Sequence, residues 1–84
     1  MHKNSLSAYA QLPLSTRERE VVSIFTNAAQ PITDRQCMTL GGYSEVNNVR
    51  PRITHLLEMG ILHEVGDTQC EETGKTVRLC AVKP

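Results

Sequence analysis

Apolar residues in the first third of the chain recur with the period of an α-helix. The positions i, i+3, i+4 and i+7 of this stripe are Val21, Ile24, Phe25 and Ala28. Such spacing places all four side chains on one helical face, with polar residues pointing elsewhere. The helix is expected to begin at a capping box, in which the hydroxyl of Ser15 and the carboxylate of Glu18 each accept the other residue's backbone amide. It is expected to end just before Pro31, because proline disfavours helical backbone in the residue ahead of it.

A second, shorter helix follows. Thr33 and Gln36 repeat the capping arrangement three residues apart, so the helix is predicted to begin there and to run through Leu40. Gly41 and Gly42 then end it, since glycine adopts the left-handed backbone that closes a helix at little steric cost.

A third helix is predicted after a three-residue turn. Ser44 or Asn48 can cap it, and it runs to Met59 with Gly60 as its C-terminal stop. A start near Asn48 puts Pro51 in the first turn, where a proline leaves no helical hydrogen bond unmade.

The period changes from helical spacing to two after residue 60, which indicates strands. One strand face is predicted to carry Ile61, His63 and Val65, and one face of a second strand Val77, Leu79 and Ala81. Residues 66–68 and 72–75 are rich in turn formers, so the two strands are predicted to form a hairpin with a long tip.

The order helix, short helix, turn, helix, hairpin predicts an α+β fold of the winged helix-turn-helix kind, with a three-helix core and a C-terminal β-hairpin wing. Residues 15–84 would form this domain. Residues 1–14 are expected to be a flexible arm, which docks on the domain through its few apolar side chains, Leu6, Tyr9, Leu12 and Leu14.

Length and charge narrow the functional classes. A chain of 84 residues holds one small domain and leaves no room for a deep substrate cleft, so we do not expect an enzyme. Nine basic and nine acidic side chains cancel, so any case for a nucleic-acid partner rests on local placement. No apolar stretch approaches the roughly 20 residues of a membrane span, and the N-terminus lacks the apolar run of a signal peptide. A cytoplasmic protein without a membrane partner is expected.

The cysteines and histidines do not suggest bound metal. Cys37, Cys70 and Cys80 are odd in number and lack the close pairing of a zinc site, and His55 and His63 do not supply it. Three reduced thiols are expected, with no metal and no cofactor.

The third predicted helix carries the functional signal. One arc collects its apolar residues Val46, Val49, Ile53, Leu56 and Leu57. The opposite arc collects Ser44, Asn47, Asn48, Pro51, Thr54 and His55, with Arg50 and Arg52 on its flanks. Short amides and hydroxyls fit the major groove of DNA, where asparagine contacts adenine and threonine touches the thymine methyl group. An ordinary solvated face with two surface arginines is the alternative.

Residues 48–53, Asn-Val-Arg-Pro-Arg-Ile, then Leu56, Gly60 and Ile61, resemble small bacterial and phage-encoded winged helix-turn-helix proteins, whose recognition region reads N-x-V-R-P-R. Residues 73–75, Thr-Gly-Lys, followed by Val77-Arg78, resemble the wing turn of the same proteins, so the likeness covers residues 15–82. The resemblance implies a role in DNA binding for Asn48, Arg50 and Arg52.

Sequence-specific binding of double-stranded DNA, by a small transcriptional regulator of phage or prophage type, is therefore the leading hypothesis. Bases would be read by Asn47, Asn48, Thr54 and His55. Phosphates would be held by Arg35, Arg50, Arg52, Lys75 and Arg78. Few charges on the helix suggest that tight binding needs a dimer or a second protein.

The competing hypothesis is a protein-interaction module of the same fold. The wing carries four acids, Glu64, Asp67, Glu71 and Glu72, against Lys75 and Arg78. Such a wing, together with the apolar arm, could bind a protein of the transcription or replication machinery.

Overall fold

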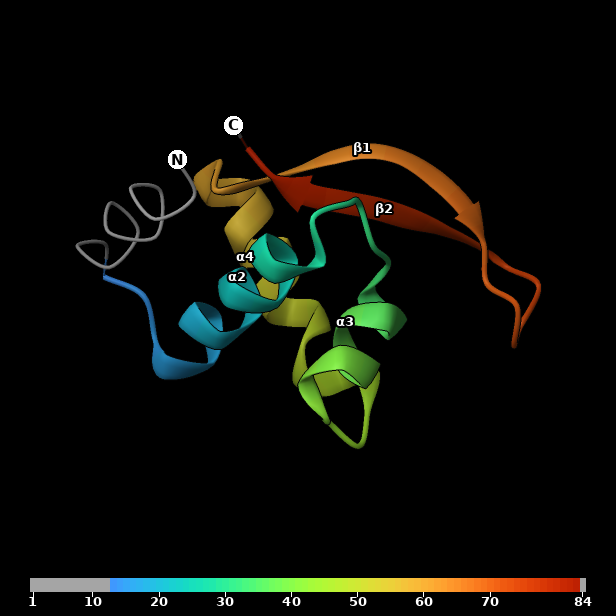
Figure 1. Cartoon of the computed structure of the whole chain (residues 1–84), viewed down its shortest axis with the longest axis horizontal. Coiled ribbons are helices and arrows are strands. Elements are labelled where there is room, and N and C mark those ends of the chain that lie inside the picture. The colour runs from blue at the N-terminus through green and yellow to red at the C-terminus, as the bar shows by residue number, and fades with distance from the viewer. Residues whose placement is uncertain (1–12, 84) are drawn as a thin grey trace.

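The computed structural model describes residues 13–83, so the predicted arm lies outside the described residues except for its last two positions (Figure 1). The elements in chain order are α2 (Thr16–Ala28), α3 (Asp34–Gly41), the 3-10 turn η1 (Val46–Asn48), α4 (Arg50–Met59), β1 (Leu62–Gln69) and β2 (Thr76–Val82). Three α-helices followed by a two-stranded antiparallel sheet confirm the predicted α+β class and form a small winged helix-like domain. The long hairpin extends beyond the helices on the side of α3 (Figure 1).

Both predicted capping boxes are formed. The hydroxyls of Ser15 and Thr33 each accept the backbone N–H three residues ahead, at 3.1 Å, and the side chains of Glu18 and Gln36 accept the cap N–H in return, at 2.9 Å. Each box satisfies two amides that the first helical turn would otherwise leave unpaired. Helices α2 and α3 therefore begin where the sequence predicts.

The start of α4 differs from the prediction. Its N-cap is the buried Val49, with no side-chain cap, so the expectation that Ser44 or Asn48 caps the helix is wrong. The backbone instead winds through η1, and the N–H of Val49 donates to the carbonyl of Val46 at 3.0 Å. Pro51 lies in the first turn of α4 as predicted, where its missing N–H leaves no bond unmade.

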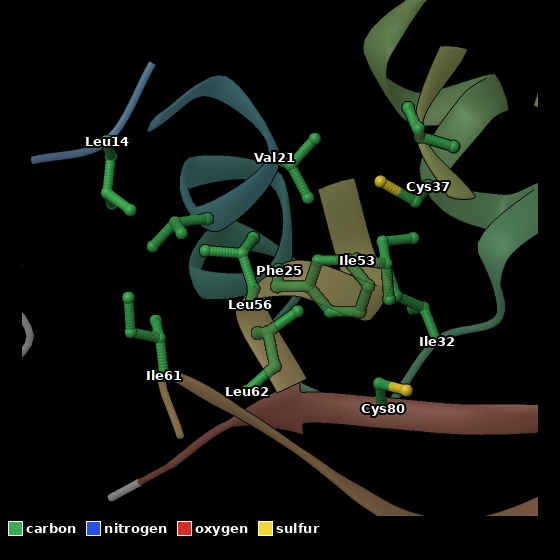
Figure 2. Packing of buried hydrophobic residues seen from close by; sticks show 12 residues of the cluster. Leu14, Val21, Phe25, Ile32, Cys37, Ile53, Leu56, Ile61, Leu62 and Cys80 are labelled. Atoms are coloured by element: carbon green, nitrogen blue, oxygen red, sulfur yellow. The ribbon is translucent and has the colours of Figure 1, made fainter. Parts of the chain in front are cut away.

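The core lies between α2, α4 and the end of the hairpin where Leu62 pairs with Val82, which is the near end of the hairpin (Figure 2). Its buried side chains are Leu14, Val21, Val22, Phe25, Ile32, Cys37, Val49, Ile53, Leu56, Ile61, Leu62 and Cys80. The apolar arc predicted for the third helix is confirmed, because Val49, Ile53 and Leu56 are fully buried and Val46 and Leu57 pack against them. Inward packing of that arc turns the polar arc of α4 outward.

The strands of the hairpin are longer than predicted. Pairing runs from Leu62 opposite Val82 to Gln69 opposite Thr76, so residues 66–68, predicted as a turn, belong to β1. A β-bulge between Glu64 and Gly66 takes up the irregularity, because a bulge inserts an extra residue without ending the pairing. The turn itself comprises residues 70–75.

The bulge also changes which side chains face the core. Val65 stands at the irregularity and is 45% exposed, so the alternation predicted for Ile61, His63 and Val65 is interrupted. On β2 the core residue is Cys80, whose backbone pairs with Ile32 through two hydrogen bonds of 2.9 and 3.0 Å. This bridge fastens the near end of the hairpin to the segment between α2 and α3.

None of the helices within residues 13–83 is long and apolar enough to cross a membrane.

Candidate nucleic-acid interface

The outer face of α4 and of the turn before it lies on the surface. Asn47, Arg50, Arg52, Thr54 and His55 are exposed, and Asn48 is half-buried. Within residues 13–83, the side chains of Asn47 and Arg52 form no hydrogen bond or ion pair, so both are available to a ligand.

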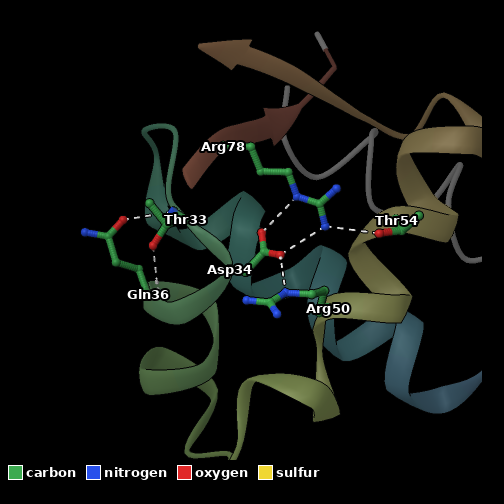
Figure 3. Close-up of polar contacts among 6 residues, drawn as sticks. All are labelled: Thr33, Asp34, Gln36, Arg50, Thr54 and Arg78. Atoms are coloured by element: carbon green, nitrogen blue, oxygen red, sulfur yellow. Dashed lines mark hydrogen bonds and ion pairs between the residues drawn. The ribbon is translucent and has the colours of Figure 1, made fainter. Parts of the chain in front are cut away.

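Arg50 and Arg78 converge on the carboxylate of Asp34 (Figure 3). Arg78 donates from Nε to Oδ1 at 3.1 Å and from Nη2 to Oδ2 at 3.0 Å, and its Nη2 also donates to the hydroxyl of Thr54 at 3.1 Å. Arg50 donates from Nε to Oδ2 at 3.4 Å. Burial opposes ionisation of Arg78, but the hydrogen bond and charge of Asp34 outweigh it, and the pKa of Arg78 is raised.

A groove of about 490 Å³ opens beside this cluster, between the start of α3, the start of α4 and the hairpin. Its charged lining consists of the cations Arg35, Arg50, Lys75 and Arg78 and the single acid Asp34. The chain as a whole has no net charge, whereas the charged residues that line this groove are four cations and one acid. Arg35 also forms an ion pair of 3.6 Å with Glu72 of the hairpin turn.

His55 contacts the body of the protein as well as the surface. Its Nδ1 pairs with the carboxylate of Glu18, a buried residue of α2. This hydrogen bond, together with the backbone N–H of Ser15, lowers the pKa of Glu18. The pair links α2 to α4, and no sequence signal connects two residues 37 positions apart.

The turn ahead of α4 is held by Arg17 of α2. Its guanidinium lies 4.8 Å from the centre of the Tyr43 ring and donates to the backbone carbonyl of Asn48 at 3.3 Å. The hydroxyl of Tyr43 donates to Glu20 at 2.6 Å, and burial followed by this hydrogen bond raises the pKa of Tyr43 to about 12. These contacts help to hold Asn47 and Asn48 in place ahead of α4, and no local sequence pattern indicates them.

The three cysteines have different surroundings, because Cys70 is only half-buried and hydrogen bonds from Thr73 lower the pKa of its thiol. Cys37 and Cys80 are buried, and burial raises their thiol pKa values to about 12 and about 11. In the part of the chain that the structure describes, no group of three or more His, Cys, Asp or Glu side chains could hold a metal ion.

A comparison with protein-family models and with curated proteins finds no match to this chain. Function is therefore inferred from the exposed polar face of α4 and the cationic groove beside it. Together they offer hydrogen-bonding side chains next to positive charge, and these are the groups that contact base edges and phosphates in protein–DNA complexes.

Proposed function

We propose that the protein binds double-stranded DNA in a sequence-specific manner, with α4 in the major groove, as a small transcriptional regulator of phage or prophage type. The observation that carries this proposal is that four cations and only one acid line one groove of a chain whose net charge is zero. A local excess of positive charge strengthens binding to a polyanion even when the net charge of the protein is zero.

Base reading is proposed for four residues on the outer face of α4 and the preceding turn, namely Asn47, Asn48, Thr54 and His55. Asn47 is exposed without a partner in the described chain, so its amide can donate to and accept from one adenine. The hydroxyl of Thr54 accepts from Arg78 and keeps its own proton to donate. His55 uses Nδ1 for Glu18, which leaves Nε2 for a base edge.

Phosphate binding is proposed for cations on both walls of the groove and on the flank of α4. Arg52 stands exposed in the first turn of α4, and Lys75 is exposed on the hairpin. Arg50 keeps more than half of its side chain exposed while it contacts Asp34, so it can also turn toward a phosphate. Arg35 and Arg78 line the same groove and add positive potential to it.

The small number of contacts favours binding as a pair of copies. Non-specific affinity grows with the number of phosphates neutralised, and this domain offers few cations for that purpose. Two domains on adjacent half-sites multiply their affinities, and half-sites one helical turn apart suit a symmetric dimer.

Selection of bound duplexes from a random DNA pool tests the proposal. Enrichment of one short motif is expected, and a palindrome of that motif would identify two copies per site. If the folded protein retains no duplex from the pool after several rounds of selection at low salt, DNA binding is refuted.

A protein-interaction module is the second candidate. It is favoured by the exposed acids Glu71 and Glu72 at the hairpin tip and by the half-buried apolar side chains Leu79 and Ala81 of β2. Its partner would be a basic and apolar surface on a protein of the transcription or replication machinery. In that case α4 would remain unaffected by DNA, and the hairpin would be the surface that responds to its partner.

A further inference from the structure

We infer that Asp34 is a positioning residue of the proposed DNA interface, which sets the hairpin relative to α4 and so brings Lys75 and the face of α4 to one duplex. This inference rests on the proposed function.

Three elements meet on this one carboxylate (Figure 3). Asp34 is the first residue of α3, Arg50 is the first residue of α4, and Arg78 lies within β2. The Asp34 side chain is only 10% exposed, and Arg78 binds both of its oxygens. Charge-assisted bonds of this two-pronged kind are stronger and more directional than neutral ones. Loss of one partner leaves a shielded charge uncompensated, which is costly.

The position of Arg78 along the hairpin gives the contact its importance. Cys80 fastens β2 to Ile32 nearer the core, whereas every residue of β1 from Glu64 onward is exposed. Beyond Arg78, one further ion pair within residues 13–83 connects the hairpin to the helices. It joins Arg35 to Glu72, whose side chains are 37% and 69% exposed. Ion pairs between exposed side chains contribute little to stability. Along the hairpin from the core toward its tip, the bond between Arg78 and Asp34 is therefore the last strong contact with the helices before Lys75 is reached.

The two arginines differ in how tightly they are held. Arg78 has two bonds to Asp34 and one to Thr54, and 24% of its side chain is exposed. Arg50 has one contact of 3.4 Å and is 52% exposed. Arg78 thus acts as the anchor of the hairpin, and Arg50 is the member of the cluster that can reach a phosphate without breaking the anchor.

Charge and position predict opposite outcomes for a variant at this site. Asp34 is a negative charge in a groove proposed to face phosphate, so on charge alone Asp34→Asn would bind DNA more tightly. If the carboxylate positions the hairpin, the variant instead loses affinity for its selected sequence, because Lys75 and the base-reading face no longer engage together.

The test compares the wild type with Asp34→Asn on the selected duplex and on a scrambled duplex of equal length, by fluorescence anisotropy over a range of salt. Misalignment equivalent to one base contact is expected to weaken binding to the selected duplex about tenfold, while binding to the scrambled duplex is unchanged or slightly tighter. Glu71→Gln is the matched control, since it removes one negative charge from the exposed hairpin turn and should tighten both complexes equally. A folded Asp34→Asn protein that binds the selected duplex as tightly as the wild type would overturn the inference.

Two further measurements separate positioning from folding and from the proposed function. Arg78→Lys keeps a positive charge next to Asp34 but cannot bind both of its oxygens at once. Like Asp34→Asn, it should bind the selected duplex more weakly and the scrambled duplex about as well as the wild type does. Hydrogen exchange without DNA should quicken at residues 76–79 in Asp34→Asn, with α2 unchanged. Unaltered exchange there would refute the attachment, whatever the protein binds. Faster exchange in a protein that ignores DNA would instead refute the proposed function alone.

Discussion

Truncation of Arg52 gives the cleanest test of how α4 would engage DNA. The side chain is exposed in the first turn of the helix and has no partner within the described residues. Replacement by alanine therefore removes a charge without removing a structural contact, and stability should change by no more than about 0.5 kcal/mol. Any loss of DNA affinity then reports on binding itself.

The size of the effect follows from counterion release. One phosphate contact contributes about 0.9 to the slope of log affinity against log salt. Between about 50 and about 200 mM salt that contact accounts for a roughly 3.5-fold change in affinity. Arg52→Ala should therefore bind more weakly than the wild type at low salt, and its affinity should fall about 3.5-fold less over this range. Arg50→Ala should flatten the slope similarly and also lose some stability, because Arg50 contacts Asp34.

Fluorescence anisotropy with the selected duplex at five or six salt concentrations measures both slopes. Lys83→Ala is the matched control, because it removes the same charge beside Gly60, at the opposite end of α4 from Arg52. Its slope should match that of the wild type. Parallel lines for Arg52→Ala and the wild type would refute the placement of Arg52 at a phosphate.

Two other predictions concern the fold that presents this face. Gly60 closes α4 with a φ of 81°, so Gly60→Ala should lower the free energy of unfolding in urea by about 1 kcal/mol. Gly66→Ala, at a strand position with open space around it, should cost less than half as much, and equal losses would argue against the left-handed cap. The lowered pKa of Glu18 contributes stability that is present above the group's ordinary pKa of 4.5 and is lost as pH falls through the folded-state value. Chemical unfolding from neutral to acidic pH should show the advantage of the wild type over Glu18→Gln shrinking in acid, and a constant advantage would contradict the pairing with His55.

Local sequence signals predicted the helices well. Ser15 with Glu18 and Thr33 with Gln36 form the expected caps, because a capping box needs only residues three positions apart. The cap of α4 escaped prediction, since the buried Val49 occupies it and tertiary packing replaces the side-chain hydrogen bond.

The orientation of the hairpin and the contacts around Asp34 could not be predicted from the sequence, because they depend on residues far apart along the chain. Apolar side chains occur on both faces of β2, so the sequence pattern could not show that Cys80 is its fully buried residue or that Arg78 lies on the same side. Residues 34, 50, 54 and 78 meet only because three elements pack together. The sequence predicts that Arg78 contacts a phosphate. Its bond to Asp34 adds a structural role that no local spacing could reveal.

A titration of the isotope-labelled protein with the selected duplex, followed by amide NMR at low salt, shows directly which surface meets DNA. If α4 enters the major groove, the largest shifts fall on residues 46–55 of η1 and α4 and on residues 75–78 of the hairpin, which border the groove. Shifts absent from α4, with changes only at the acidic hairpin tip or none at all, would contradict DNA recognition by this helix.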